Sequence, residues 1–206
     1  MRRLLACLLL LVGSSPLLAG EFNPTLSIGD AAPQWAKLPG VDGKQHALDD
    51  FKAQDVVVLF FTCNSCEYAI DYEDRIIALA KKHAGDDSRV GLVGVNVNLI
   101  EDDRLPKMKE KAEKKGFPFV YVFDETQKIA KDYGASTTPE FFVLNKERKV
   151  IYMGSLDDNS DAKKATVNYV QLAIDAALDG KSPAKAETVP IGCLVRYEKM
   201  RRTKKR

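Results

Sequence analysis

Two cysteines separated by two residues, Cys63 and Cys66, have the spacing in this sequence best suited to chemistry. The pair follows an apolar run and precedes a segment with helical periodicity, so we expect it where a strand leads into a helix. Free backbone N–H groups and the helix dipole stabilise a thiolate there, so the pKa of Cys63 should be lowered, although Glu67 opposes this. Cys66, one turn further in, should be more buried and able to attack a mixed disulfide on Cys63. The spacing predicts thiol–disulfide exchange.

Two other interpretations of the pair are a zinc site and two buried cysteines without a role. A structural zinc ion takes four ligands, usually from a second C-x-x-C or from paired histidines. No second C-x-x-C follows, and the two histidines, His46 and His83, are isolated. We therefore expect no metal site, and thiol chemistry needs no nucleotide or flavin cofactor.

The elements that would position the cysteines can be read on both sides of the pair. Val56–Phe61 is a continuous apolar run, typical of a central strand that is covered on both faces. Over residues 69–80, apolar side chains recur at three- and four-residue spacing, which predicts an amphipathic helix.

The remaining chain alternates between strand and helix patterns. Asp42-Gly43 is a turn signal, which predicts a small hairpin near the start of the body. This order indicates an α/β fold: a mixed central sheet flanked by helices, with an N-terminal β-hairpin extension. Further strands are expected over residues 90–97, 119–123, 140–145 and 149–153, and helices over 105–115, 129–133 and 167–178.

Length and charge limit the classes of protein that this chain can represent. With 206 residues, 45% hydrophobic and 29% charged, it is long enough for a single well-buried core, which we place at residues 20–180. The net charge is +2, yet both ends are basic and the stretch between them is acidic. An acidic body disfavours nucleic-acid binding. The basic tail, residues 196–206, is interpreted as solvated.

Residues 1–19 have the pattern of a secretory signal peptide. Arg2 and Arg3 precede an apolar stretch, Leu4–Val12, and small residues follow at Ala19 and Gly20. The stretch is shorter than the roughly 20 residues that span a bilayer, so we expect no stable membrane span. The mature protein is predicted to be exported, either to a periplasm or to the outside. Cys7 would leave with the signal.

Cys193 is the remaining thiol, in a C-terminal extension over residues 181–206. Its apolar surroundings, Val189–Val195, should dock against the body, and Gly192 would allow a close approach of the backbone. Two interpretations stay open. Cys193 is either a small buried apolar residue, as free cysteines often are, or a third thiol that folds back near the C-x-x-C pair.

A strand, a C-x-x-C and a helix, with Thr137-Thr138-Pro139 opening a later hairpin, resemble the thioredoxin superfamily. Gly29–Pro33 is similar to its redoxin branch, which includes the alkyl hydroperoxide reductase and thiol-specific antioxidant proteins. The likeness extends over residues 29–178. It implies a thioredoxin fold with Pro139 in the cis form, beside the cysteines. It also implies that Thr138 and Pro139 present backbone to an extended substrate.

The sequence departs from both kinds of relative. Thr62 stands where thioredoxins have tryptophan, and Asn64-Ser65 lack their proline. Peroxiredoxins place a threonine three residues before the reactive cysteine and a proline four residues before that. Counting back from Cys66 gives Cys63 and Leu59, and counting back from Cys63 gives Phe60 and Val56, so the pattern is absent on either count.

The leading hypothesis is therefore an exported thiol–disulfide oxidoreductase that exchanges disulfides with protein partners. Cys63 would attack and Cys66 would resolve, and a second redox protein would recycle the pair. The alternatives are a thiol-dependent peroxidase of the antioxidant branch and a non-enzymatic thioredoxin-like binding module.

Overall fold

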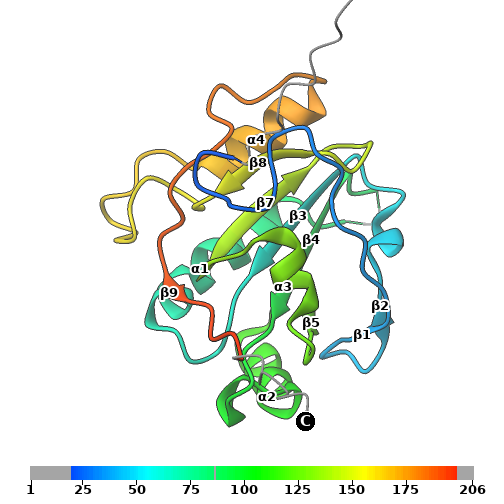
Figure 1. Ribbon diagram of the computed structural model, residues 1–206, viewed down its shortest axis with the longest axis vertical. Helices are drawn as coiled ribbons and strands as arrows, with labels where there is room; N and C mark the ends of the chain where they lie inside the picture. Colours follow the sequence, from blue (N-terminus) through cyan, green and yellow to red (C-terminus); the bar gives the residue numbers. More distant parts are fainter. Residues whose placement is uncertain (1–19, 86, 199–206) are drawn as a thin grey trace, which may run out of the picture.

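The computed structural model describes residues 20–85 and 87–198. The predicted signal, residues 1–19, and most of the basic tail, residues 199–206, lie outside the described residues. The elements, shown in Figure 1, are β1 (Leu38–Pro39), β2 (Gln45–His46), the 3-10 helix η1 (Leu48–Phe51), β3 (Val56–Phe61), α1 (Glu67–Lys82), β4 (Val90–Asn96), the 3-10 helix η2 (Glu101–Asp103), α2 (Leu105–Lys115), β5 (Val120–Phe123), α3 (Lys128–Tyr133), β6 (Thr137–Thr138), β7 (Glu140–Leu144), β8 (Val150–Gly154), α4 (Tyr169–Leu178) and β9 (Cys193–Leu194).

A five-stranded sheet in the order β5-β4-β3-β7-β8 forms the centre of the fold. Strands β3, β4 and β5 run parallel, and β7 and β8 add to them antiparallel. This arrangement confirms the predicted mixed sheet. The short antiparallel pair β1 and β2 confirms the N-terminal hairpin.

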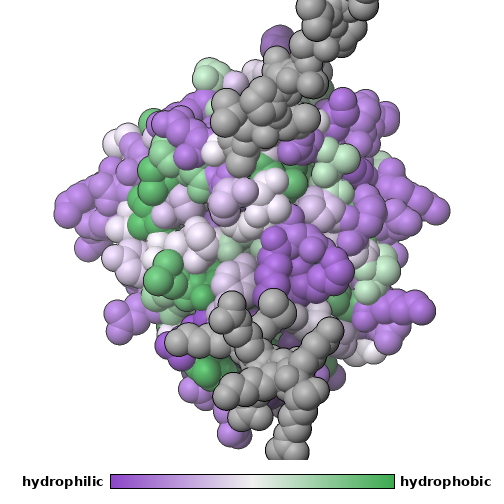
Figure 2. All heavy atoms as spheres, in the orientation of Figure 1, coloured by the Kyte–Doolittle hydropathy of each residue, from purple (hydrophilic) through white to green (hydrophobic). Residues whose placement is uncertain are grey.

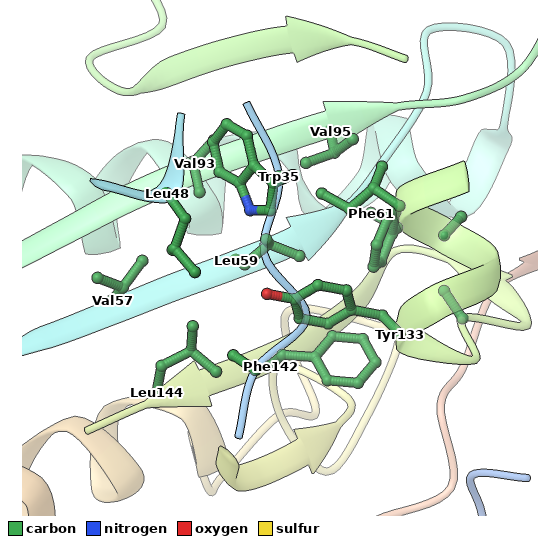
Figure 3. Packing of buried hydrophobic residues seen from close by; sticks show 14 of the residues in the cluster. Trp35, Leu48, Val57, Leu59, Phe61, Val93, Val95, Tyr133, Phe142 and Leu144 are labelled. Carbon is green, nitrogen blue, oxygen red and sulfur yellow. The ribbon is translucent and has the colours of Figure 1, made fainter. Parts of the chain in front are cut away.

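Strand β3 separates two apolar clusters, because alternate side chains of a strand point to opposite faces. Val57, Leu59 and Phe61 pack with Trp35 and Tyr133 on one face, under α3 and the N-terminal segment. The other three residues of β3 pack against α1 and α4. Figure 3 shows the first cluster, in which the rings of Phe61, Tyr133 and Phe142 lie edge to face. Burial on both faces explains why β3 reads as an unbroken apolar run.

Irregular chain covers both outer edges of the sheet. Along β5, Gly40 bridges to Val122. Along β8, Ala31 bridges to Lys149, and the backbone N–H of Met153 donates to the carbonyl of Ala186 at 3.0 Å.

Helix α1 begins two residues earlier than the apolar pattern indicates and helix α4 two residues later, and in each a side chain caps the start. Helix α1 begins at Glu67, and the thiol of Cys66 accepts from the N–H of Ala69. Helix α4 begins at Tyr169, where the Asn168 side chain accepts from the N–H of Gln171 at 2.8 Å. An N-cap residue has extended backbone angles and so ends the helical path.

Residues 186–198, here called the strap, return from α4 to the centre of the molecule. In Figure 1 the strap runs in orange and red down one side, reaching β9. Strand β9 pairs antiparallel with β6, and Val195 is buried. Of the segment Val189–Val195, which we expected to dock, Val195 is buried against the body, whereas Val189 and Leu194 are 58% and 76% exposed.

The surface seen in Figure 2 mixes hydrophilic side chains with small, separate apolar areas. Across the described residues, every helix is too short or too polar to cross a bilayer.

Candidate active site

Strand β3 ends at Phe61, and a single residue, Thr62, separates it from Cys63. Cys63 and Cys66 are both buried, with 3% and 4% of their surface exposed, and both are free thiols. They form a small cluster with Ala69, against which Cys193 packs. The structure therefore brings together three cysteines, of which the sequence pairs only two by spacing.

Cys66 is the acidic thiol of this cluster. Hydrogen bonding with the neighbouring Cys63 thiol, and to a lesser extent with Cys193 and with the N–H of Ala69 at 3.4 Å, holds the pKa of Cys66 well below its usual range. The carbonyl of Thr138, 3.2 Å from Cys66 Sγ, favours the protonated form. The interaction with Cys63 is the largest effect, and it outweighs the burial that raises the pKa of Cys66, because hydrogen bonds to a thiolate are charge-assisted.

The sequence placed the lowered pKa on Cys63, and the geometry reverses that order. Helix α1 starts after Cys66 rather than at Cys63, so the helix N-terminus acts on Cys66. The pKa of Cys63 is raised, first by its hydrogen bond with Cys66, then by burial, and also by the negative charge of Asp103. The two thiols are also about equally buried, whereas Cys66 was expected to lie deeper.

Asp103, which the sequence did not single out, fixes the loop between the cysteines. Its buried carboxylate accepts from the N–H of Asn64 at 2.6 Å, the N–H of Ser65 at 3.1 Å and the hydroxyl of Ser65 at 2.7 Å. Asn98 donates to the same carboxylate at 3.3 Å. In the sequence Asp103 stands in an acidic run, Glu101-Asp102-Asp103, which resembles an ordinary solvated turn.

Thr138 contacts both cysteines of the pair. Its hydroxyl lies 3.4 Å from Cys63 Sγ, and its carbonyl faces Cys66. The Thr138-Pro139 peptide bond is cis, as the resemblance implied. Glu140 fixes this turn by accepting from the N–H groups of Ser136 and Thr137 at 2.7 and 3.0 Å.

The backbone of Thr138 is also the place where Cys193 arrives. Strand β9 sets Cys193 opposite Thr138 and Leu194 opposite Thr137. Among the residues that the structure describes, His, Cys, Asp and Glu side chains form no group able to hold a metal ion. The arrangement places a thiol with a lowered pKa beside a second thiol with a raised pKa, as an attacking and a resolving thiol in thiol–disulfide exchange would be placed.

Comparison with known proteins agrees with this chemistry. The model of the AhpC/TSA family matches residues 28–153. The thiol-disulfide oxidoreductase ResA of Geobacillus thermodenitrificans is 26% identical over 154 residues, covering 73% of this chain and 83% of the relative. The peroxiredoxin Bcp of Escherichia coli is 32% identical over 116 residues, covering 54% of this chain and 66% of the relative.

The similarity continues in solved structures. A conserved protein from Geobacillus kaustophilus superposes with a TM-score of 0.78 at 32% identity, covering 85% of this chain and 95% of that one. The fold is thioredoxin-like, which confirms the predicted fold class.

Proposed function

Because this chain belongs to the AhpC/TSA family, we propose that it is a thiol–disulfide oxidoreductase acting on protein thiols and disulfides through Cys66 and Cys63. The family and its relatives make it an oxidoreductase in general terms. The observation that carries the finer proposal is that Cys63 and Cys66 lie together, buried, against Thr138 and its cis bond to Pro139, with the pKa of Cys66 lowered and that of Cys63 raised.

Cys66 is the attacking thiol in this proposal, and Cys63 resolves. The Cys66 thiolate attacks one sulfur of a substrate disulfide, the substrate S–S bond breaks, and the released thiolate takes a proton from solvent. Cys66 is now uncharged, so the main cause that raises the pKa of Cys63 is gone. Cys63 loses its proton and attacks Cys66 Sγ, which expels the second substrate thiolate. The pair is oxidised by two electrons, and the substrate is reduced by two.

Thr138 and Pro139 serve as the docking backbone. A substrate segment paired with β6 would bring its cysteine over Cys66, because the carbonyl of Thr138 already lies 3.2 Å from Cys66 Sγ. Extended segments that pair with an exposed edge gain affinity from main-chain hydrogen bonds.

Single cysteine substitutions test the assignment in an insulin-reduction assay with dithiothreitol as the recycling thiol. We expect Cys66→Ser to reduce turnover to the background rate. We expect Cys63→Ser to accumulate a mixed disulfide with the substrate on Cys66, most of all when Cys193 is also serine. Full activity of Cys66→Ser would contradict the proposal, and so would mixed disulfides that form on Cys63 instead.

A thiol-dependent peroxidase is the second candidate, and the 32% identity to the peroxiredoxin Bcp favours it. Cys63 stands where peroxiredoxins have threonine, which weighs against it. Peroxide consumption with a thiol reductant separates the two activities. Turnover far above that of a free thiol would place peroxide among the substrates.

Export belongs to the same proposal and rests on the pattern of residues 1–19. The recycling partner would then be another exported redox protein. N-terminal sequencing of the protein recovered from the extracytoplasmic fraction tests this. A mature chain that still starts at Met1 would contradict it.

A further inference from the structure

Strand β9 lies along the edge that the proposed function reserves for substrates. It pairs antiparallel with β6, with Cys193 opposite Thr138, and the N–H of Val195 donates to the carbonyl of Ser136 at 2.9 Å. The chain thus supplies its own extended segment at this edge, with a cysteine above Cys66.

Gly192 shows how closely this segment fits the edge. A Cβ atom at position 192 would lie 2.2 Å from the carbonyl oxygen of Thr138 and 3.0 Å from the nitrogen of Pro139. Real Cβ atoms do not approach backbone so closely, so any other residue would move β9 away. The glycine is therefore required for the placement of Cys193.

Both sides of β9 are anchored to the body. Before it, the buried hydroxyl of Thr188 lies 2.7 Å from the hydroxyl of Tyr152 and accepts from the N–H of Ser155 at 2.9 Å. After it, the hydroxyl of Tyr197 donates to the carbonyl of Ala135 in the body at 2.6 Å. The side-chain amide of Gln127 donates to the carbonyl of Arg196 in the strap at 2.9 Å. Between Val189, whose carbonyl accepts from the hydroxyl of Ser155, and the buried Val195, the only regular element is the two-residue β9, so a short stretch can leave and rejoin β6 while its ends stay in place.

The side chain of Cys193 lies against the cysteine pair. It packs against Cys63, Cys66 and Ala69. Burial and the neighbouring Cys66 raise the pKa of Cys193, so it is the protonated partner of a thiolate. Cys193 is also more exposed than either cysteine of the pair.

We propose that Cys193 is a third redox thiol of this site: β9 takes the place of a bound substrate strand, and Cys193 forms an internal disulfide with Cys66. This deepens the proposed function and rests on it, because the oxidant is the substrate disulfide. A substrate strand displaces β9 and forms a mixed disulfide with Cys66, and the return of β9 resolves it.

Resolution exchanges the disulfide between Cys66 and the substrate for a disulfide between Cys66 and Cys193. Cys193 loses its proton and attacks Cys66 Sγ, the bond between Cys66 and the substrate sulfur breaks, and the departing thiolate takes up the proton. Cys66 and Cys193 together lose two electrons, which the substrate disulfide has gained. In the reverse direction, a recycling thiol attacks the more exposed Cys193 sulfur, and Cys66 leaves as the better-stabilised thiolate.

Oxidised glutathione, with disulfide mapping by mass spectrometry after non-reducing digestion, tests the proposal without a protein substrate. In Cys63→Ser we expect the Cys66–glutathione adduct to convert to a Cys66–Cys193 disulfide, with two glutathione thiols released per chain. In Cys63→Ser with Cys193→Ser the adduct should persist.

Gly192→Ala in the Cys63→Ser background tests the placement of β9 while keeping both thiols. We expect the conversion to slow about a hundredfold, since a shift of about 1 Å in a reacting group can cost that much. Val189→Ala is the matched control, because Val189 lies in the strap and its side chain is 58% exposed. The control should convert at the parent rate.

A persistent adduct in Cys63→Ser, with Cys193 still open to alkylation, would overturn the proposal. Conversion at the same rate in Gly192→Ala would overturn the role of β9. Neither result bears on the insulin assay, where the loss of activity in Cys66→Ser stands or falls separately.

Discussion

The carboxylate of Asp103 accepts a hydrogen bond from the backbone N–H of Asn64 at 2.6 Å. This contact joins η2 to the loop between the two cysteines. It occupies a backbone donor that would otherwise be free to stabilise a thiolate on Cys63, and it adds a buried negative charge nearby. Asp103 therefore helps to decide which of the two cysteines carries the charge.

Asp103→Asn should make Cys63 more reactive. The asparagine oxygen still accepts from the loop, but the negative charge that raises the pKa of Cys63 is removed. We expect faster alkylation of Cys63, resolved by mass spectrometry, and a loss of about 1–3 kcal/mol in unfolding free energy, because hydrogen bonds to a charged group weaken. The exposed neighbour Asp102, changed to Asn, is the control. Equal alkylation of Cys63 in both variants would contradict this reading of the site.

The pH dependence of stability should report the charge on Cys66. Its folded pKa lies below the unfolded value, so the stabilisation is complete above an unfolded pKa of about 8.5 and is lost as pH falls toward the folded pKa. Below about pH 8.5 the raised pKa of Cys63 adds no pH dependence, because Cys63 is then protonated in both the folded and the unfolded protein. Urea unfolding should show the advantage of wild type over Cys66→Ser shrinking from about pH 9 to about pH 5. An advantage that is constant across this range would argue against a thiolate on Cys66.

The contribution of Glu140 to stability should change with pH in the opposite direction, falling as the pH rises. Burial raises its pKa in the folded state, so its contribution is complete below an unfolded pKa of about 4.3 and is lost as pH rises through the folded value. Glu140→Gln keeps an acceptor for Ser136 and Thr137 without the charge. We expect it to match wild type near pH 4 and to be more stable near pH 7. Glu140→Ala, which leaves the two N–H groups unpaired, should be less stable than either at both pH values.

Leu59→Ala tests the cluster shown in Figure 3. Leu59 is fully buried at the centre of β3, and its loss should lower the unfolding free energy by about 2–5 kcal/mol. Leu172→Ala is the matched control, because that side chain is 54% exposed, and its effect should stay within about 0.5 kcal/mol. Chemical denaturation measures both. A similar loss in the two variants would mean that the packing around Leu59 is looser than described.

The sequence predicts the elements of this fold well because their signals are local. The apolar run Val56–Phe61 is strand β3 without a change of bounds, and the charged helix that ends at Gly116 is α2. The left-handed backbone at Gly116, with φ of 62°, is what a glycine at a helix end favours.

The chemistry of the site was harder to predict, because it depends on contacts between distant residues. The order of the two thiol pKa values turns on where α1 begins and on Asp103, which lies 39 residues after Asn64. Spacing identifies Cys63 and Cys66, but it cannot show that Cys193 pairs with Thr138. The two interpretations of Cys193 therefore needed the tertiary structure.

The outer edges of β5, β8 and β6 are each covered by another stretch of this chain. An open edge offers unpaired N–H and C=O groups to any extended chain, including another copy of the same protein, and is a route to aggregation. Of these edges, β6 is the one that our proposal opens during turnover. The strap then protects the molecule from self-association whenever no substrate is bound. Because Gly192 is required for β9 to lie on this edge, the solubility of this protein at high concentration should depend on that single glycine.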